Sequence, residues 1–263
     1  METERFPKQS LIEEAQDNIK SEKYEKAISN LATVLESDRK NIQALNLMGQ
    51  ALTDLNAYKK ALSCFNLALD IDPNSTTAMI GKANVLSETK DFLDSIAWFD
   101  KALKNDPSNV EALVNKGILL DKMGRHDQAL TLYQDVLKQD PNHETALVNS
   151  GLAKCSQKNI EEGIELFNKA LEINPRHVRA LASKGLILAM TNKNKNALDC
   201  FDKALEINPK NTEALTNKGI VLFNLGKHEQ AIKYFDKSLE IEPTNSVTLS
   251  MKTDCQNILK SNK

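Results

Sequence analysis

Apolar residues recur along the chain at a spacing typical of α-helices. Between residues 110 and 143, Leu113, Gly117 and Leu120 lie three or four residues apart, and the pattern then breaks at Gly124. A second run of small or apolar residues follows the break: Ala129, Tyr133, Val136 and Leu137. Residues at this spacing share one face of a helix. The stretch therefore predicts two amphipathic helices joined by a turn.

The two-helix pattern repeats along the chain. Six of the seven prolines follow one another at intervals of 34 residues, with no insertion: Pro73, Pro107, Pro141, Pro175, Pro209 and Pro243. Each is preceded by Asp, Asn or Glu, and most are followed by a polar residue. Proline lacks the amide hydrogen that a helix interior requires, and polar side chains cap helix N-termini. The prolines therefore mark turns between repeats, and the unbroken period predicts a stacked array.

Small and large residues alternate between columns of this repeat. The first helix carries a small residue in every repeat: Ala15, Gly49, Ala83, Gly117, Gly151, Gly185 and Gly219. The second helix carries another: Ala27, Ala61, Ser95, Ala129, Gly163, Ala197 and Ala231. A bulky column follows: Leu31, Phe65, Phe99, Tyr133, Phe167, Phe201 and Phe235. A leucine column runs from Leu35 to Leu239. Glycine inside a helix costs about 1 kcal/mol relative to alanine, so we expect close approach of the two helices and one continuous core.

Repeats of 34 residues with Leu, Gly, Ala, an aromatic residue and Pro in this order resemble tetratricopeptide repeats of the free-standing prokaryotic type. The resemblance implies an all-α fold, a right-handed superhelical solenoid of helix-turn-helix hairpins. In this frame seven units fill residues 8–245: 8–41, 42–75, 76–109, 110–143, 144–177, 178–211 and 212–245. Residues 1–7 form an N-terminal extension, and 246–263 are predicted to be a C-terminal capping helix. Polar residues break the columns at both ends of the array, as a cap requires.

Two interior units depart from the pattern. Unit 144–177 has Lys154 in a leucine column and Gly163 in the alanine column, and unit 178–211 joins its helices through the polar run 191–196. We expect this region to be the least stable interior part of the array, which hydrogen exchange would test.

The overall charge is near zero, with a formal net charge of −2. Such a chain has no global field that would attract nucleic acid or an anionic membrane. The first twenty residues lack the apolar core of a secretory signal, and the longest apolar run, 185–190, is far shorter than a membrane span. We therefore expect a cytoplasmic protein with neither nucleic acid nor membrane as a partner.

No residue pattern indicates catalysis, a metal site or a cofactor. The four cysteines are scattered without a CxxC pair, which favours buried, idle thiols. His126 and His228 occupy matching positions in the turns between helices, while His143 and His177 end successive units. Duplication explains this spacing better than chemistry does. The common phosphate, dinucleotide, acyl-transfer and zinc-protease motifs are absent, so the sequence predicts no enzyme.

The family resemblance implies that the first helices line a concave, peptide-binding groove. Asparagine stands two residues before the helix-one glycine at Asn115, Asn149 and Asn217, with Ser183 in the unit between. An asparagine amide offers a donor and an acceptor to an extended peptide backbone. Leu47 and Gly81 interrupt the row in earlier units, although Asn46 and Asn84 are further groove candidates. The alternative is that duplication copied a harmless polar residue onto a solvated face.

Charge adds one asymmetry. Unit 178–211 has six basic and three acidic residues. The excess would attract an acidic ligand segment near Arg179, but solvated charge in a turn is the explanation that we favour. The family's clamp for chaperone C-termini is matched only at Asn149 and Arg179 across units 110–211, so we reject that mode.

We therefore expect a scaffold or adaptor that binds a protein or peptide partner in its groove. The alternative is a structural array that associates with itself as a homo-oligomer. Apolar residues near the ends of the chain make this possible: Phe6, Leu249 and Leu259.

Overall fold

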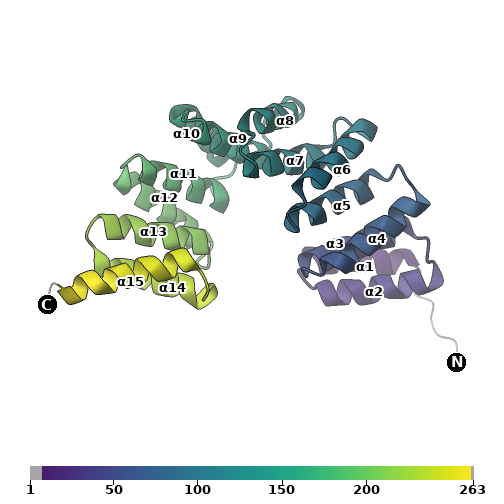
Figure 1. The fold of residues 1–263 in the computed structure, drawn as a ribbon, viewed down its shortest axis with the longest axis horizontal. Helices are drawn as coiled ribbons and strands as arrows, with labels where there is room; N and C mark the ends of the chain where they lie inside the picture. The colour runs from purple at the N-terminus through teal and green to yellow at the C-terminus, as the bar shows by residue number, and fades with distance from the viewer. Residues whose placement is uncertain (1–7, 262–263) are drawn as a thin grey trace. The chain divides into compact units, whose positions relative to one another are not determined.

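The computed structural model describes residues 8–261, which form fifteen α-helices and no strand (Figure 1). The predicted extension 1–7 lies outside the described residues. The chain divides into two compact units, the first ending at Arg125 and the second beginning at His126. The division falls inside the fourth predicted repeat.

The first unit consists of three helical hairpins followed by a single helix. Its helices are α1 (Lys8–Lys20), α2 (Tyr24–Ser37), α3 (Ile42–Asp54), α4 (Tyr58–Ile71), α5 (Thr76–Glu88), α6 (Phe92–Asn105) and α7 (Val110–Lys122). Each hairpin packs on the next, and the first helices α1, α3, α5 and α7 also contact one another in succession. These first helices thus form one continuous layer.

The second unit has the same plan after its leading helix. Its helices are α8 (His126–Gln139), α9 (Glu144–Ser156), α10 (Ile160–Ile173), α11 (Val178–Met190), α12 (Asn194–Ile207), α13 (Thr212–Asn224), α14 (His228–Ile241) and α15 (Ser246–Ser261). His126 and His228 begin helices α8 and α14, so placing them in turns was wrong by one residue. The predicted terminal helix is present over 246–261, and its role as a cap stays a prediction.

The small residues of the first helices make room for aromatic rings. A Cβ atom added at Gly49 would lie 2.6 Å from Cζ of Phe65, and one added at Gly185 would lie 2.7 Å from Cε1 of Phe201. Both rings are almost fully buried. The glycines therefore admit the ring of the paired helix, which is a more specific reason than the close helix approach that we expected.

Close approach of two backbones does occur in the hairpin α9–α10. A Cβ atom at Gly163 would lie 2.7 Å from the carbonyl oxygen of Gly151 and would overlap Sγ of Cys155. In the same hairpin Lys154, the residue that replaces leucine, forms an ion pair with Glu162 at 2.6 Å. The lower stability expected for this region stays a prediction.

The leucine column lies between hairpins and is only half-buried. Leu35 packs against the cluster of Leu45 in the next hairpin, and Leu171 against the cluster of Leu181. The residues one position earlier are fully buried: Val34, Ala68, Ala102, Val136, Ala170, Ala204 and Ser238. The leucines therefore join successive hairpins, while the preceding residues fill each hairpin's interior.

Side chains two residues after each proline cap the first helices. Asn109 Oδ1 accepts the backbone N–H of Ala112 at 3.0 Å, and Ser75 occupies the same position on α5. His143 and His177 act in the same way, since their Nδ1 atoms accept from Ala146 and Ala180 at 3.2 and 3.1 Å. These histidines thus serve as N-caps, which satisfy an otherwise unpaired helix N–H.

Every hairpin turn contains a residue with positive φ. Asn192 has φ 59° and Lys158 has φ 68°, whereas Gly124 and Gly226 hold the same position in two other repeats. The turn of the sixth repeat has only three residues, because α12 already begins at Asn194. The expectation that the whole run 191–196 is a connection was therefore wrong.

Candidate peptide-binding groove

The first helices of the first unit line a groove with a volume of about 1080 Å³. The predicted residues Asn46, Asn84 and Asn115 all line it, from α3, α5 and α7. Further polar side chains surround them: Gln16, Gln43, Gln50, Thr53, Thr77 and Ser87. Because the first helices follow one another in contact, side chains at equivalent positions project into one shared space.

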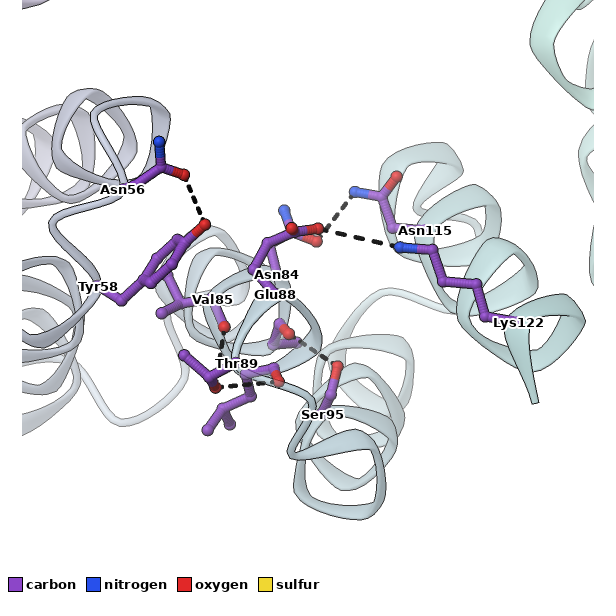
Figure 2. Close-up of polar contacts among 11 residues, drawn as sticks. Asn56, Tyr58, Asn84, Val85, Glu88, Thr89, Ser95, Asn115 and Lys122 are labelled. Carbon is purple, nitrogen blue, oxygen red and sulfur yellow. Dashed lines mark hydrogen bonds and ion pairs between the residues drawn. The ribbon is translucent and has the colours of Figure 1, made fainter. Parts of the chain in front are cut away.

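The asparagines are linked across neighbouring helices. Asn115 Nδ2 donates to Asn84 Oδ1 at 3.1 Å, as Figure 2 shows. The Asn84 amide also lies near enough to the Glu111 carboxylate to lower its pKa, although burial raises it more. Asn46 Oδ1 is shielded from solvent and has no hydrogen-bond partner among the described residues. The groove therefore holds one connected amide pair and one unsatisfied acceptor.

An aromatic ring interrupts the asparagine row. The row position in α5 is Gly81, where a Cβ atom would lie 2.8 Å from Cδ1 of Phe65. Both residues line the groove. Glycine is required here because any side chain would displace the ring, which explains why the row lacks an asparagine in this repeat.

Charged groups in the groove are mostly acidic. Asp54, Glu88 and Glu111 line it together with a single cation, Lys122. Lys122 Nζ lies 4.0 Å from Glu88 Oε1 (Figure 2). Burial raises the pKa of Asp54, and it raises the pKa of Glu111 against the opposing effect of the Asn84 hydrogen bond. These three carboxylates therefore have only one cationic side chain of the groove lining, Lys122, to balance their charge.

Comparison with protein families agrees with the repeat period. Models described as Tetratricopeptide repeat match residues 42–75, 86–155, 145–177, 178–211 and 212–245. The chain belongs to the tetratricopeptide repeat family. Residues 8–41 lie outside these matches, although α1 and α2 form a hairpin there. No curated protein matches the sequence.

Several solved structures share the fold of this chain. A tetratricopeptide repeat protein from Parabacteroides merdae is 17% identical, with a TM-score of 0.77 over 95% of this chain and 98% of that one. A chain of the APC/C hetero-tetramer Cut9-Hcn1 is 15% identical, with a TM-score of 0.78 over 92% of this chain and 48% of that one. Pseudomonas aeruginosa PilF is 19% identical, with a TM-score of 0.66 over 81% and 97%. At these identities the likeness concerns the fold alone.

In the second compact unit, 126–263, the predicted binding residues have different surroundings. Asn149 is only 2% exposed, and its Oδ1 accepts from Nη2 of the exposed Arg179 at 2.7 Å. Ser183 is 3% exposed, and Asn217 is half-buried. Within this unit the structure thus joins Asn149 to Arg179 but largely withdraws Asn149 and Ser183 from solvent.

The basic excess of the sixth repeat gathers partly in a separate pocket. Lys184, Lys193 and Lys195 line a space of about 540 Å³ that Arg179 does not reach. Lys184 occupies the column in which the lysines of other repeats bridge to the preceding hairpin. Lys116 binds Asp100 at 2.5 Å, and Lys252 binds Asp236 at 2.6 Å.

Sequence reasoning missed several groove residues of this tetratricopeptide array. Glu111 lies four residues before Asn115, Ile118 three after it and Lys122 seven after it, and all three line the groove. These intervals share one helix face. Extending the asparagine column by helical spacing would have found them.

The described residues offer no other obvious chemistry. Residues 8–261 contain no group of three or more His, Cys, Asp or Glu arranged to hold a metal ion. None of their helices combines the length and apolar character that crossing a bilayer requires. The four cysteines are buried free thiols, and burial raises the pKa of Cys155 to about 11.

Proposed function

We propose that this tetratricopeptide repeat protein is a scaffold or adaptor whose first-unit groove holds an extended segment of a partner protein. Membership of the family supports a protein-interaction role in general. The observation that carries the proposal is the meeting of Asn46, Asn84 and Asn115 in one groove. Cytoplasmic location stays a prediction.

Amide groups suit this task because each presents both a donor and an acceptor. A peptide backbone in extended conformation carries the complementary groups at regular intervals. Asn46 Oδ1 lacks a partner among the described residues, and rotation of its amide toward the groove would let it accept an incoming N–H. The Asn84–Asn115 pair keeps two amides oriented before a ligand arrives, which reduces the entropy lost on binding.

The test compares proteins captured from the native cell by two variants of the full chain. The groove variant combines Asn46→Ala, Asn84→Ala and Asn115→Ala. The matched control combines Asn142→Ala, Asn224→Ala and Asn257→Ala, which are exposed and outside this groove. We expect mass spectrometry to find a partner that the control retains and the groove variant loses. Equal capture by both variants, with equal helical content by circular dichroism, would place the interface elsewhere.

Self-association is the second candidate, and the terminal helix favours it. Val247 and Leu249 on α15 are 55% and 44% exposed. Leu259 is half-buried, and Phe6 lies outside the described residues. Light scattering should then show a mass that rises with concentration and returns to the monomer value in Leu249→Ser. A constant monomer mass in the wild type would remove this candidate.

A further inference from the structure

We infer that the segment held in the first-unit groove is basic, with an arginine or lysine side chain seated against Glu111. The inference deepens the proposed function and rests on it. The partner segment is an internal or N-terminal stretch that contributes positive charge and hydrogen-bond donors.

Glu111 has an accessible carboxylate without an ion-pair partner among the described residues. It lies in the first turn of α7, one turn before Asn115, and its side chain is exposed to the groove. The Asn84 amide lies near it and lowers its pKa, and no lysine, arginine or histidine of the described residues forms an ion pair with it. Glu88, by contrast, has Lys122 at 4.0 Å.

The remaining hydrogen-bonding groups point to the same ligand chemistry. Asn46 Oδ1 lacks a donor, and Asn84 Oδ1 is already occupied by Asn115. Ionised carboxylates such as Asp54 only accept hydrogen bonds. Asn46 Oδ1 and the carboxylates of the groove can only accept hydrogen bonds, so a ligand that brings N–H groups and ammonium or guanidinium ions complements them.

Electrostatic surroundings strengthen the case. Partial desolvation in the groove raises the pKa of Asp54 and of Glu111, so a cation placed beside these carboxyls would favour their charged forms. A guanidinium group can donate two parallel hydrogen bonds to one carboxylate. An acidic segment or a peptide C-terminus would instead bring like charge toward Asp54 and Glu111.

The experiment selects ligands without assuming their sequence. Phage-displayed random linear peptides are selected on the immobilised full chain, and the best binders are measured by fluorescence anisotropy. We expect these peptides to be rich in arginine and lysine. Glu111→Gln should weaken their binding roughly tenfold, as loss of one charge-assisted hydrogen-bonded pair implies.

A matched control comes from the repeat itself. Glu213 occupies the position of Glu111 in the seventh repeat, on α13 and outside this groove, so Glu213→Gln should leave the affinity unchanged. Replacing the critical peptide arginine with neutral citrulline should lower the affinity for the wild-type protein as much as Glu111→Gln does. The same replacement should lower the affinity for the Glu111→Gln protein very little.

The outcomes separate this inference from the proposed function. Suppose that the combined substitution Asn84→Ala and Asn115→Ala weakens peptide binding, but the selected peptides are acidic or bind the Glu111→Gln protein as tightly as the wild type. The inference of a basic ligand would then be wrong, while the proposed groove function would stand. Peptides indifferent to all of these substitutions, or no selected peptide at all, would count against both.

Discussion

The contact between Gly163 and Cys155 gives a sharp test of how the fifth hairpin is packed. Adding a Cβ atom at Gly163 would overlap Sγ of Cys155 and approach the Gly151 carbonyl oxygen to 2.7 Å. The sixth repeat has Ala197 and Ala189 at the positions of Gly163 and Cys155. The double substitution Gly163→Ala with Cys155→Ala therefore rebuilds a pair that the chain already uses.

The expected energies follow from packing and helix propensity. Overpacking a core costs about 1–3 kcal/mol, while alanine gains about 1 kcal/mol over glycine inside a helix, so Gly163→Ala alone should cost about 1 kcal/mol. Cys155→Ala alone should also cost about 1 kcal/mol through loss of one buried heavy atom. In the double variant the overlap with sulfur is gone, and only the contact with the Gly151 carbonyl remains. We expect it to be more stable than additivity allows, by about 1 kcal/mol.

Equilibrium urea unfolding of the four proteins, followed by circular dichroism, measures this coupling. The midpoint should shift while the slope stays constant, since the surface exposed on unfolding is unchanged. If the two single effects add to the double effect within about 0.5 kcal/mol, the sulfur atom is not what excludes alanine at position 163. The role assigned to Cys155 in the packing of α9 on α10 would then be refuted.

Three further substitutions or measurements test other parts of the fold. Lys158 has a left-handed backbone (φ 68°), so Lys158→Gly should raise the free energy of unfolding by about 0.5–1 kcal/mol. Gly226→Lys should lower it, because Gly226 holds the same position in its repeat. Equal stability of the wild type and the two variants would contradict this. Asn168 stands sixteen residues before Lys184, where three other repeats have Asp100, Asp202 and Asp236. Asn168→Asp should therefore stabilise by about 0.2–1 kcal/mol, an effect that salt removes, and a gain that persists in high salt would have another cause. Burial raises the pKa of all four thiols, so a thiol reagent should react slowly with the native protein and fully after unfolding; rapid native labelling would show an exposed cysteine.

The period of 34 residues was enough to predict the helices, because it lines up core columns that every repeat must keep. Phe65 and Phe201 have to be buried between paired helices, and Gly49 and Gly185 have to admit their rings. Each repeat keeps the same packing contact, so similar residue types recur every 34 residues along the sequence. The division after Arg125 leaves no comparable sign, since the columns run through it unchanged.

Contacts between repeats were harder to predict than contacts within one. Lys116 and Asp100 are sixteen residues apart and lie on the helices of different hairpins. Nothing in a single helix links them, and their columns vary between repeats, with Met48 and Ala32 at the matching positions of early repeats. The interval recurs at Lys252 and Asp236, so a search for charge pairs at one fixed separation across repeats would have shown it.

The asparagine column shows why equivalent positions do not imply equivalent roles. Asn115 lines the groove and donates to Asn84 on the neighbouring first helix, whereas Asn149 is buried and accepts from Arg179. The difference arises from the neighbouring helix, which supplies an amide in one case and a guanidinium group in the other. Repetition therefore fixes the backbone on which a groove is built, while the residues that vary between repeats, such as Glu111, decide what the groove can bind. Substitutions meant to probe function belong at those variable positions.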